Sequence, residues 1–168
     1  MTITWYFAYG SNMNPDRMAA RGLAVNRALA GKMHGFQLCF NKRATGKKNI
    51  AYANVGYSPG SVVEGVLYQL KNPEDITLMD PFEGTPYRYS RDVFLIQTAQ
   101  GDIAAWVYVA NQAMLAEGLL PEQLYLNHLL AGKQWHSDEY QQWLSEHPAV
   151  DNTTALNNST LNGLTHNV

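Results

Sequence analysis

The chain has 168 residues, of which 46% are hydrophobic, and its formal net charge at pH 7 is −2. This length and apolar content suit one globular domain with its own core. The sequence has no basic stripe of the kind that binds nucleic acid and no basic amphipathic helix of the kind that binds membranes. No apolar run reaches the ~18 residues that a membrane-spanning helix needs, and the first residues show no signal-peptide pattern. We expect a soluble, cytoplasmic protein that binds neither nucleic acid nor membranes.

The first stretch predicts a strand, a tight polar turn and a helix in that order. Residues 3–8 are mostly β-branched or aromatic, as in a strand, and Gly10 ends them. Asn14 can cap a helix and Pro15 suits the first helical position, so we expect a helix over residues 15–21. Such a turn directs backbone N–H groups outward beside a helix dipole, which favours a carboxylate or an oxyanion. The alternative is that this segment is a turn and nothing more.

The middle of the chain predicts short strands separated by turns at Gly31, at residues 42–49 and at residues 56–60, followed by a helix. Asn72 can cap that helix, Pro73 occupies its first position, and the helix should end near Pro81. A hairpin and two further helices should follow it. The expected strands cover residues 3–8, 24–29, 33–41, 50–55, 62–70, 87–98 and 102–110, and the last two helices cover residues 121–131 and 138–145.

Six or seven short strands with a few helices indicate an α+β fold. The expected architecture is a small mixed, mostly antiparallel β-barrel with peripheral helices. Residues 149–168 are rich in Asn and Thr and poor in aromatic residues. They cannot bury enough apolar area to offset the ~1 to 2 kcal/mol that ordering each residue costs. We therefore expect a catalytic domain over residues 1–148 and a flexible tail over residues 149–168.

The histidines and the cysteine give no sign of a metal site. No His-x-x-x-His or Cys-x-x-Cys pattern is present, so no bound metal is expected. Cys39 is the only cysteine, which rules out an internal disulfide and suits a reducing cytoplasm. Its apolar surroundings favour a buried small side chain over a nucleophile. The scattered histidines are His34, His128, His136, His147 and His166.

Glu83 is the candidate general base. Pro81, Phe82 and Pro86 should form an apolar collar around it, and desolvation of a carboxyl group raises its pKa. A raised pKa is what a general base needs near neutral pH. The alternative is an exposed glutamate after a helix. Asp80 is the local competitor and has a structural acceptor as its other possible role.

Three segments resemble the gamma-glutamylcyclotransferase family. Tyr6-Phe7-Ala8-Tyr9-Gly10-Ser11-Asn12 is similar to the signature loop of that family, and Phe82-Glu83-Gly84 with the following Tyr89-Ser90-Arg91 is a second match. A third, weaker match is the segment 120–125 that leads into a helix. The resemblance extends from about Tyr6 to Leu144, and it implies the same small barrel.

The resemblance also implies a reaction. In this family the α-amine of a γ-glutamyl compound attacks its own γ-carbonyl, which releases 5-oxoproline and an amine or amino acid without any cofactor. Glu83 would remove the proton from the amine and return it to the leaving nitrogen, and Tyr9 to Asn12 would form the oxyanion hole. The implied partner is a small γ-glutamyl substrate, as in glutathione metabolism, and the protein would be a monomer or a homodimer. The other implied substrate-binding residues are Tyr6, Phe7, Ala8, Gly10, Ser11 and Tyr125.

Several alternatives stay open. Tyr125 is equally well explained as a packed helix aromatic. Ser11 lies on an exposed turn, but no Gly-x-Ser-x-Gly elbow surrounds it, so a serine nucleophile is disfavoured. A non-catalytic binding module on the same barrel is the main rival, although a binder has little use for a costly, buried and unpaired carboxyl at Glu83. The sequence leaves the leaving group of the substrate undetermined.

Overall fold

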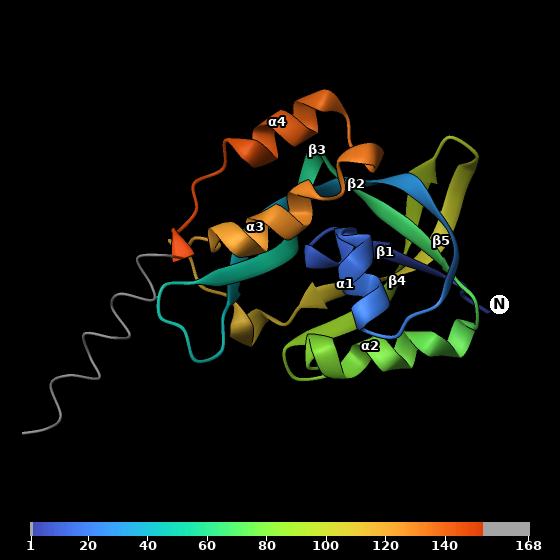
Figure 1. The fold of residues 1–168 in the computed structure, drawn as a ribbon, viewed down its shortest axis with the longest axis horizontal. Coiled ribbons are helices and arrows are strands. Elements are labelled where there is room, and N and C mark those ends of the chain that lie inside the picture. The colour runs from blue at the N-terminus through green and yellow to red at the C-terminus, as the bar shows by residue number, and fades with distance from the viewer. Residues whose placement is uncertain (1, 153–168) are drawn as a thin grey trace, which may run out of the picture.

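The computed structural model describes residues 2–152 (Figure 1). Five strands of this segment form a closed barrel in the order β1-β3-β2-β4-β5. β1 pairs antiparallel with β3 and parallel with β5 through Tyr6 and Trp106, so the sheet is mixed and mostly antiparallel. The predicted fold class is therefore confirmed. The strands are β1 (Trp5–Ala8), β2 (Val25–Arg43), β3 (Ala51–Leu70), β4 (Tyr89–Thr98) and β5 (Gly101–Ala110).

Two long strands replace the four short strands predicted between residues 24 and 70. The glycine at Gly31 was expected to end a strand, but it pairs with Gly65 inside the β2–β3 ladder. A Cβ atom at Gly31 would lie 2.7 Å from Ile96, so this glycine serves close packing inside the barrel. The turn predicted at residues 56–60 is instead an irregular part of β3, where the pairing register with β2 shifts.

Four α-helices lie outside the barrel in the described part of the chain. Figure 1 shows α3 and α4 along one side and α2 across another. The 138–145 helix is confirmed, and Ser137 caps it by accepting a hydrogen bond of 3.2 Å from the backbone N–H of Tyr140. The helices are α1 (Pro15–Ala20), α2 (Ile76–Glu83), α3 (Gln123–Leu130) and α4 (Asp138–Ser145), with short 3-10 turns at Ser11–Met13, Pro73–Asp75, Gln112–Met114 and Lys133–Trp135.

The boundaries of α2 differ from the prediction at both ends. The segment from Pro73 begins as a 3-10 turn, and the α-helix continues past Pro81 to Glu83. Gly84 then adopts the left-handed conformation, with φ of 66°, which ends the helix. As a result, Glu83 is the last residue of the helix and has a fixed backbone. The helix was predicted to end near Pro81, and it extends two residues further.

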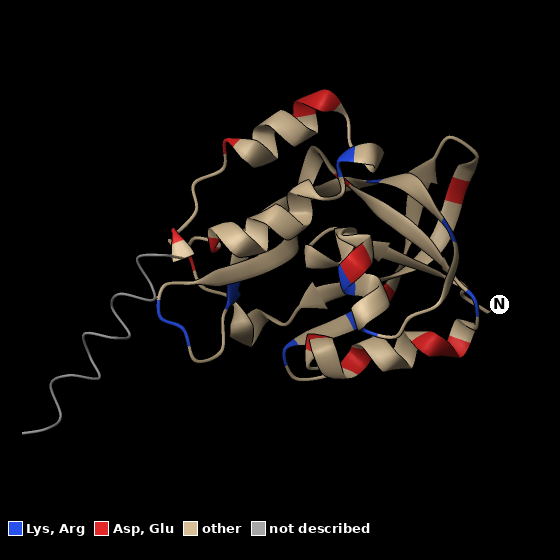
Figure 2. Ribbon diagram, in the orientation of Figure 1, with Lys and Arg blue, Asp and Glu red and all other residues tan. Residues whose placement is uncertain are grey.

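The apolar core fills the barrel and continues beneath the helices. Phe7 of β1 and Met79 of α2 are both fully buried within it. Charged residues of both signs are interspersed along the chain (Figure 2). No helix among the described residues is long and apolar enough to cross a membrane. Residues 153–168, which make up most of the expected flexible tail, lie outside the described residues.

Candidate active site

The turn that follows β1 crosses one end of the barrel. After Ala8 the chain passes through Tyr9 and Gly10 into the 3-10 turn Ser11–Met13 and then into α1. Asn14 caps α1 by accepting a hydrogen bond of 3.0 Å from the N–H of Asp16. The predicted order of strand, turn and helix is thus present, with one extra helical turn inserted. The first N–H groups of a helical turn have no acceptor within that turn, so those of Ser11 and Asn12 stay available at the barrel end.

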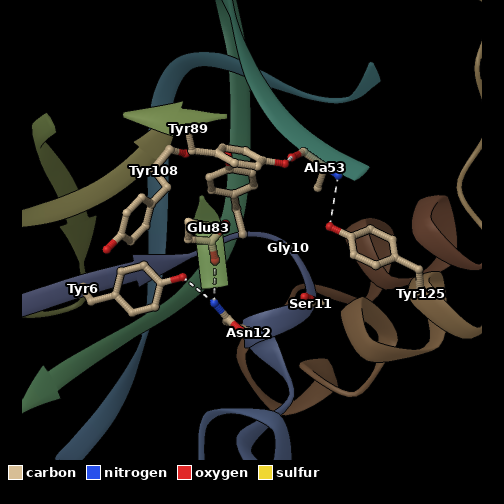
Figure 3. A pocket seen from close by; sticks show the side chains of 10 residues that line it. Tyr6, Gly10, Ser11, Asn12, Ala53, Glu83, Tyr89, Tyr108 and Tyr125 are labelled. Carbon is tan, nitrogen blue, oxygen red and sulfur yellow. Dashed lines mark hydrogen bonds between the residues drawn. The ribbon is translucent and has the colours of Figure 1, made fainter. Parts of the chain in front are cut away.

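Asn12 connects this turn to Glu83. Its Nδ2 atom donates to Oε1 of Glu83 at 3.2 Å and to the hydroxyl oxygen of Tyr6 at 2.8 Å (Figure 3). Oε1 of Glu83 also accepts a hydrogen bond of 3.3 Å from Nη1 of Arg21. Arg21 is the C-terminal cap residue of α1. The carboxylate is therefore held from two sides, by an amide and by a guanidinium. Its orientation is fixed before any ligand arrives.

Glu83 lies in a desolvated setting. Its side chain is only 17% exposed. Burial raises the pKa of Glu83, while the charge of Arg21 and the hydrogen bond from Asn12 act in the opposite direction without cancelling it. The predicted direction of the shift agrees with the structure, and a carboxyl of this kind is suited to proton transfer near neutral pH.

The cause of the burial differs from the prediction. Phe82 was expected to form an apolar collar, but it is 52% exposed and its ring lies 4.9 Å from the guanidinium carbon of Arg21. Pro81 and Pro86 are also exposed. Tyrosine rings close the site instead. Glu83 was also expected to be unpaired, and the ion pair with Arg21 shows that this was wrong.

An inner cavity opens beside Glu83, with an empty volume of about 310 Å³. Side chains from the turn, from β3 to β5 and from α3 meet there (Figure 3). Seven of the nine predicted site residues are among those that line it, namely Tyr6, Tyr9, Gly10, Ser11, Asn12, Glu83 and Tyr125. Most of the predicted site residues therefore lie around one cavity in the folded chain.

Phe7 and Ala8 are not among the residues that line the cavity. Phe7 is fully buried, and its ring lies in the space that a side chain at Gly65 would occupy. Side chains alternate along a strand, so Phe7 faces away from Tyr6. Ala8 is 1% exposed and pairs with Val66. Both residues support the wall of the barrel rather than the site, so their assignment to the substrate pocket does not match the geometry.

Tyr125 takes part in both of its expected roles. It packs against Tyr52 with 5.0 Å between ring centroids. Its hydroxyl also lines the inner cavity and accepts a hydrogen bond of 3.0 Å from the N–H of Ala53. Burial raises its pKa, so the hydroxyl stays protonated. It can therefore donate to a ligand while accepting from Ala53.

The sequence analysis did not assign Ala53, Tyr89 or Tyr108 to the site. Tyr89 donates from its hydroxyl to the carbonyl of Ala53 at 2.8 Å, and the predicted site residue Tyr9 donates to the carbonyl of Tyr108. Tyr89 and Tyr108 occupy separate strands, so only the barrel brings them together. Their hydrogen bonds hold the wall of the inner cavity in place. Tyr89 did belong to the second motif, which was the only sequence signal for this group.

Asp80 is a structural acceptor, which was one of its two possible roles. Its carboxylate accepts from Arg91 at 2.9 and 3.2 Å and from the hydroxyl of Tyr108 at 2.7 Å. A bidentate guanidinium pair of this kind fixes geometry as well as adding energy. Asp80 thereby anchors α2 to β4 and β5. Glu83, one turn later, remains the carboxylate at the cavity.

An outer cavity adjoins the inner one and shares Ser11, Glu83, Tyr89 and Tyr125 with it; its empty volume is about 640 Å³ when the open space at its mouth is included. Basic residues dominate the remainder of its lining, which consists of Arg17, Arg21, Lys42, Tyr52, Phe82 and Arg88. None of these basic residues was identified from the sequence.

Residues 2–152 contain no group of three or more His, Cys, Asp or Glu side chains placed to hold a metal ion. Cys39 is partly exposed rather than buried and lines neither cavity. His128 contacts Arg17 at 3.5 Å and Asn14 at 3.0 Å, behind the outer cavity. The two cavities together are lined by one carboxylate, several tyrosines and four basic side chains.

Comparisons with known proteins agree with this geometry. The family model described as "Gamma-glutamyl cyclotransferase, AIG2-like" matches residues 6–137. No curated protein sequence matches the chain. A solved structure named gamma-glutamyl cyclotransferase is 24% identical, with a TM-score of 0.72, and the match covers 87% of this chain and 88% of that one.

Two further structures share the fold. An uncharacterized human protein is 24% identical, with a TM-score of 0.74 and coverage of 89% of this chain and 90% of the human one. A yeast cyclotransferase described as specific to glutathione is 14% identical, with a TM-score of 0.58 and coverage of 83% and 95%. At these identities the structural similarity establishes the fold, and the family model identifies the lineage. The chain belongs to the gamma-glutamyl cyclotransferase, AIG2-like family.

Proposed function

We propose that this protein is a gamma-glutamylcyclotransferase. The α-amine of a γ-glutamyl compound attacks the γ-carbonyl carbon of the same molecule, and the amide bond to the departing amine breaks. The products are 5-oxoproline and a free amine or amino acid. The observation that carries the proposal is the Glu83 carboxylate, which has a raised pKa and is held between Asn12 and Arg21 at the inner cavity.

Glu83 moves the proton. At neutral pH the α-amine is mostly an ammonium group, which cannot attack. The Glu83 carboxylate accepts a proton from it, and the raised pKa reduces the cost of holding that proton. The protonated Glu83 then donates to the nitrogen of the departing amine as the amide bond breaks. The ring nitrogen loses a second proton as the lactam forms, and the Glu83 carboxylate passes that proton to the departed amine, which leaves as an ammonium group. The carboxylate is regenerated, so each turnover leaves the enzyme in its starting form.

The turn after β1 is assigned to the developing negative charge. Attack on the γ-carbonyl moves charge onto its oxygen. Ser11 and Asn12 line the inner cavity together with Glu83, and their N–H groups have no acceptors in their own helical turn. A well-placed donor of this kind lowers a barrier by about 3 to 4 kcal/mol. The hydroxyl of Tyr125 is a further donor at the same cavity. Because these groups are fixed in the fold, they need no rearrangement during the reaction.

A non-catalytic binding module remains the rival. The sequence argument against it assumed an unpaired carboxyl at Glu83, and that assumption fails because Arg21 neutralises the carboxylate. Product formation therefore has to distinguish the two. Incubation with a panel of γ-glutamyl amino acids, amines and peptides, followed by mass spectrometry, should detect 5-oxoproline for at least one member. Binding without any product would favour the binding module.

A further inference from the structure

Lys42 is a buried cation without an ionic partner. The residue is 2% exposed and lines the outer cavity. Its ammonium lies 5.2 Å from the ring centroid of Tyr52 and 5.5 Å from that of Tyr89. Within residues 2–152 it forms no ion pair and no side-chain hydrogen bond. A buried charge with only ring faces for partners costs stability, which points to an anion that completes the site.

The fold places Lys42 at this position through an irregularity in β2. Phe40 pairs with Ala53 and Lys42 pairs with Tyr52, so Asn41 is an extra residue in the β2–β3 ladder. Bulges of this kind redirect side chains and are frequent beside active sites. Here the bulge sets Lys42 opposite Tyr52, at the outer cavity. The cation is therefore positioned by the backbone rather than by a flexible loop.

Other cations surround the same cavity. Arg17, Arg21 and Arg88 line it together with Lys42, and Glu83 is the one carboxylate among its lining residues. Arg21 is paired with that carboxylate, which leaves Lys42, Arg17 and Arg88 without an acidic partner in the described part of the chain. Figure 2 shows basic residues on α1, near the end of β2 and in the loop after α2. Three uncompensated cations make a strong local positive potential.

The outer cavity adjoins the inner one, and this arrangement indicates which part of a substrate would contact these cations. Glu83 and Ser11 belong to both cavities, so the reacting carbonyl lies at their junction. The cyclising glutamyl part occupies the smaller, tyrosine-lined inner cavity beside the turn. The departing amine must then point into the larger outer cavity, toward Lys42.

We infer that the outer cavity binds an anionic group on the departing half of the substrate, with Lys42 as its main contact. This inference rests on the proposed function. It predicts that the enzyme prefers γ-glutamyl compounds whose leaving amine carries a carboxylate over those whose leaving amine is uncharged at that position. A charge-assisted hydrogen bond to a buried ammonium is strong enough to give a preference of about 10- to 100-fold.

Binding of unreactive analogues tests the anion site without depending on turnover. Glutaryl-L-alanine and glutaryl-L-alaninamide lack the α-amine and cannot cyclise, and they differ only in the charge of the departing half. Calorimetry on the wild-type protein should show about 10- to 100-fold tighter binding of the acid. In Lys42→Met the acid should lose that advantage while the amide binds as before. Lys71→Met, which changes an exposed lysine away from both cavities, is the matched control and should behave like wild type.

Three results would overturn the inference. These are equal wild-type affinities for acid and amide, no binding of either compound, or a loss in Lys42→Met that is the same for both. The last result would mean that Lys42 holds the glutaryl half. Arg88→Gln, at an exposed position, should weaken acid binding several-fold and gives a second variant that does not depend on the folding of Lys42→Met.

The corresponding γ-glutamyl compounds carry the α-amine and can cyclise. Turnover measured with these two compounds tests the anion site and the proposed reaction separately. Wild-type protein should release 5-oxoproline from γ-glutamyl-L-alanine with about 10-fold or greater kcat/KM than from γ-glutamyl-L-alaninamide. A wild-type protein that binds the acid analogue selectively but releases no 5-oxoproline would retain the anion site and disprove the cyclotransferase. A protein that cyclises both compounds equally would retain the reaction and disprove the anion site.

Discussion

The guanidinium of Arg21 lies 3.3 Å from the carboxylate of Glu83, and both side chains are largely buried, with exposures of 13% and 17%. This pair joins the end of α1 to the end of α2 at the mouth of the inner cavity. It explains how a desolvated carboxylate remains in the fold without a ligand. It also means that the reactivity of Glu83 reflects two opposing influences, burial and an adjacent cation.

The ion pair gives a prediction about pH. Arg21 stabilises the charged form of Glu83, so Arg21→Gln should raise the pKa of Glu83 further. A general base is active when deprotonated, and kcat/KM should therefore rise with pH through the pKa of Glu83. The acidic limb of the profile should move to higher pH in Arg21→Gln.

Arg21→Lys keeps the positive charge and is the matched control, with a smaller displacement of the limb. The check is kcat/KM for 5-oxoproline release measured across the acidic range for all three proteins. An acidic limb that stays at the same pH in Arg21→Gln would show that Glu83 is not the group that titrates.

The turn after β1 gives a second prediction. Gly10 has φ of −110°, which is not the left-handed conformation that favours glycine. Its missing side chain instead allows a close approach, because a Cβ atom there would lie 3.1 Å from the hydroxyl of Tyr125 and 3.3 Å from Ala53. Gly10→Ala should therefore displace Tyr125, raise KM and lower kcat.

Ser11→Ala is the comparison for that variant. It deletes a hydroxyl but keeps the backbone N–H assigned to the oxyanion, so most activity should remain. A covalent serine mechanism predicts the opposite, namely an inactive Ser11→Ala protein and a burst of acyl-enzyme in the wild type. Single-turnover kinetics with identification of the product distinguishes these outcomes, because hydrolysis releases glutamate.

Asp80 gives a third prediction, which concerns stability. Asp80→Asn removes the charge that Arg91 and Tyr108 contact, so the anchor between α2 and the barrel weakens. Loss of a partly buried charge-assisted pair of this kind costs on the order of 1.5 to 3 kcal/mol. Thermal and denaturant unfolding should show a lower stability, whereas kcat should change much less than in a Glu83 variant. A large loss of kcat with unchanged stability would instead place Asp80 in the reaction.

The sequence identified the parts of the site that are contiguous in the chain. The turn with Tyr9 to Asn12 was predicted because Gly, Pro and Asn mark local backbone geometry directly. Glu83 was identified as the candidate base, although the helix was expected to end before it. Arg21, Lys42 and Tyr108 were missed because they reach the site from the end of α1, from β2 and from β5, which only the folded chain brings together. No local pattern in the sequence encodes that approach.

The fold class followed from strand-length stretches, but the strand count did not. Gly31 was interpreted as a turn residue, and its real function is to leave room for Phe7 and Ile96 inside the barrel. A glycine that makes space and a glycine that turns the chain are identical in sequence. The collar assigned to Phe82 was wrong for a related reason, since the apolar character of a residue does not say which way its side chain points.

The most direct test of the central claim is the rate of 5-oxoproline release by Glu83→Gln on the best substrate of the wild-type protein. The amide cannot accept the proton from the α-ammonium group, so kcat should fall about 10²-fold or more. Melting curves should show a folded protein, and the substrate should still bind. Asp80→Asn, measured beside it, controls for damage to the same helix. A Glu83→Gln protein that releases 5-oxoproline at a near-wild-type rate would contradict the account.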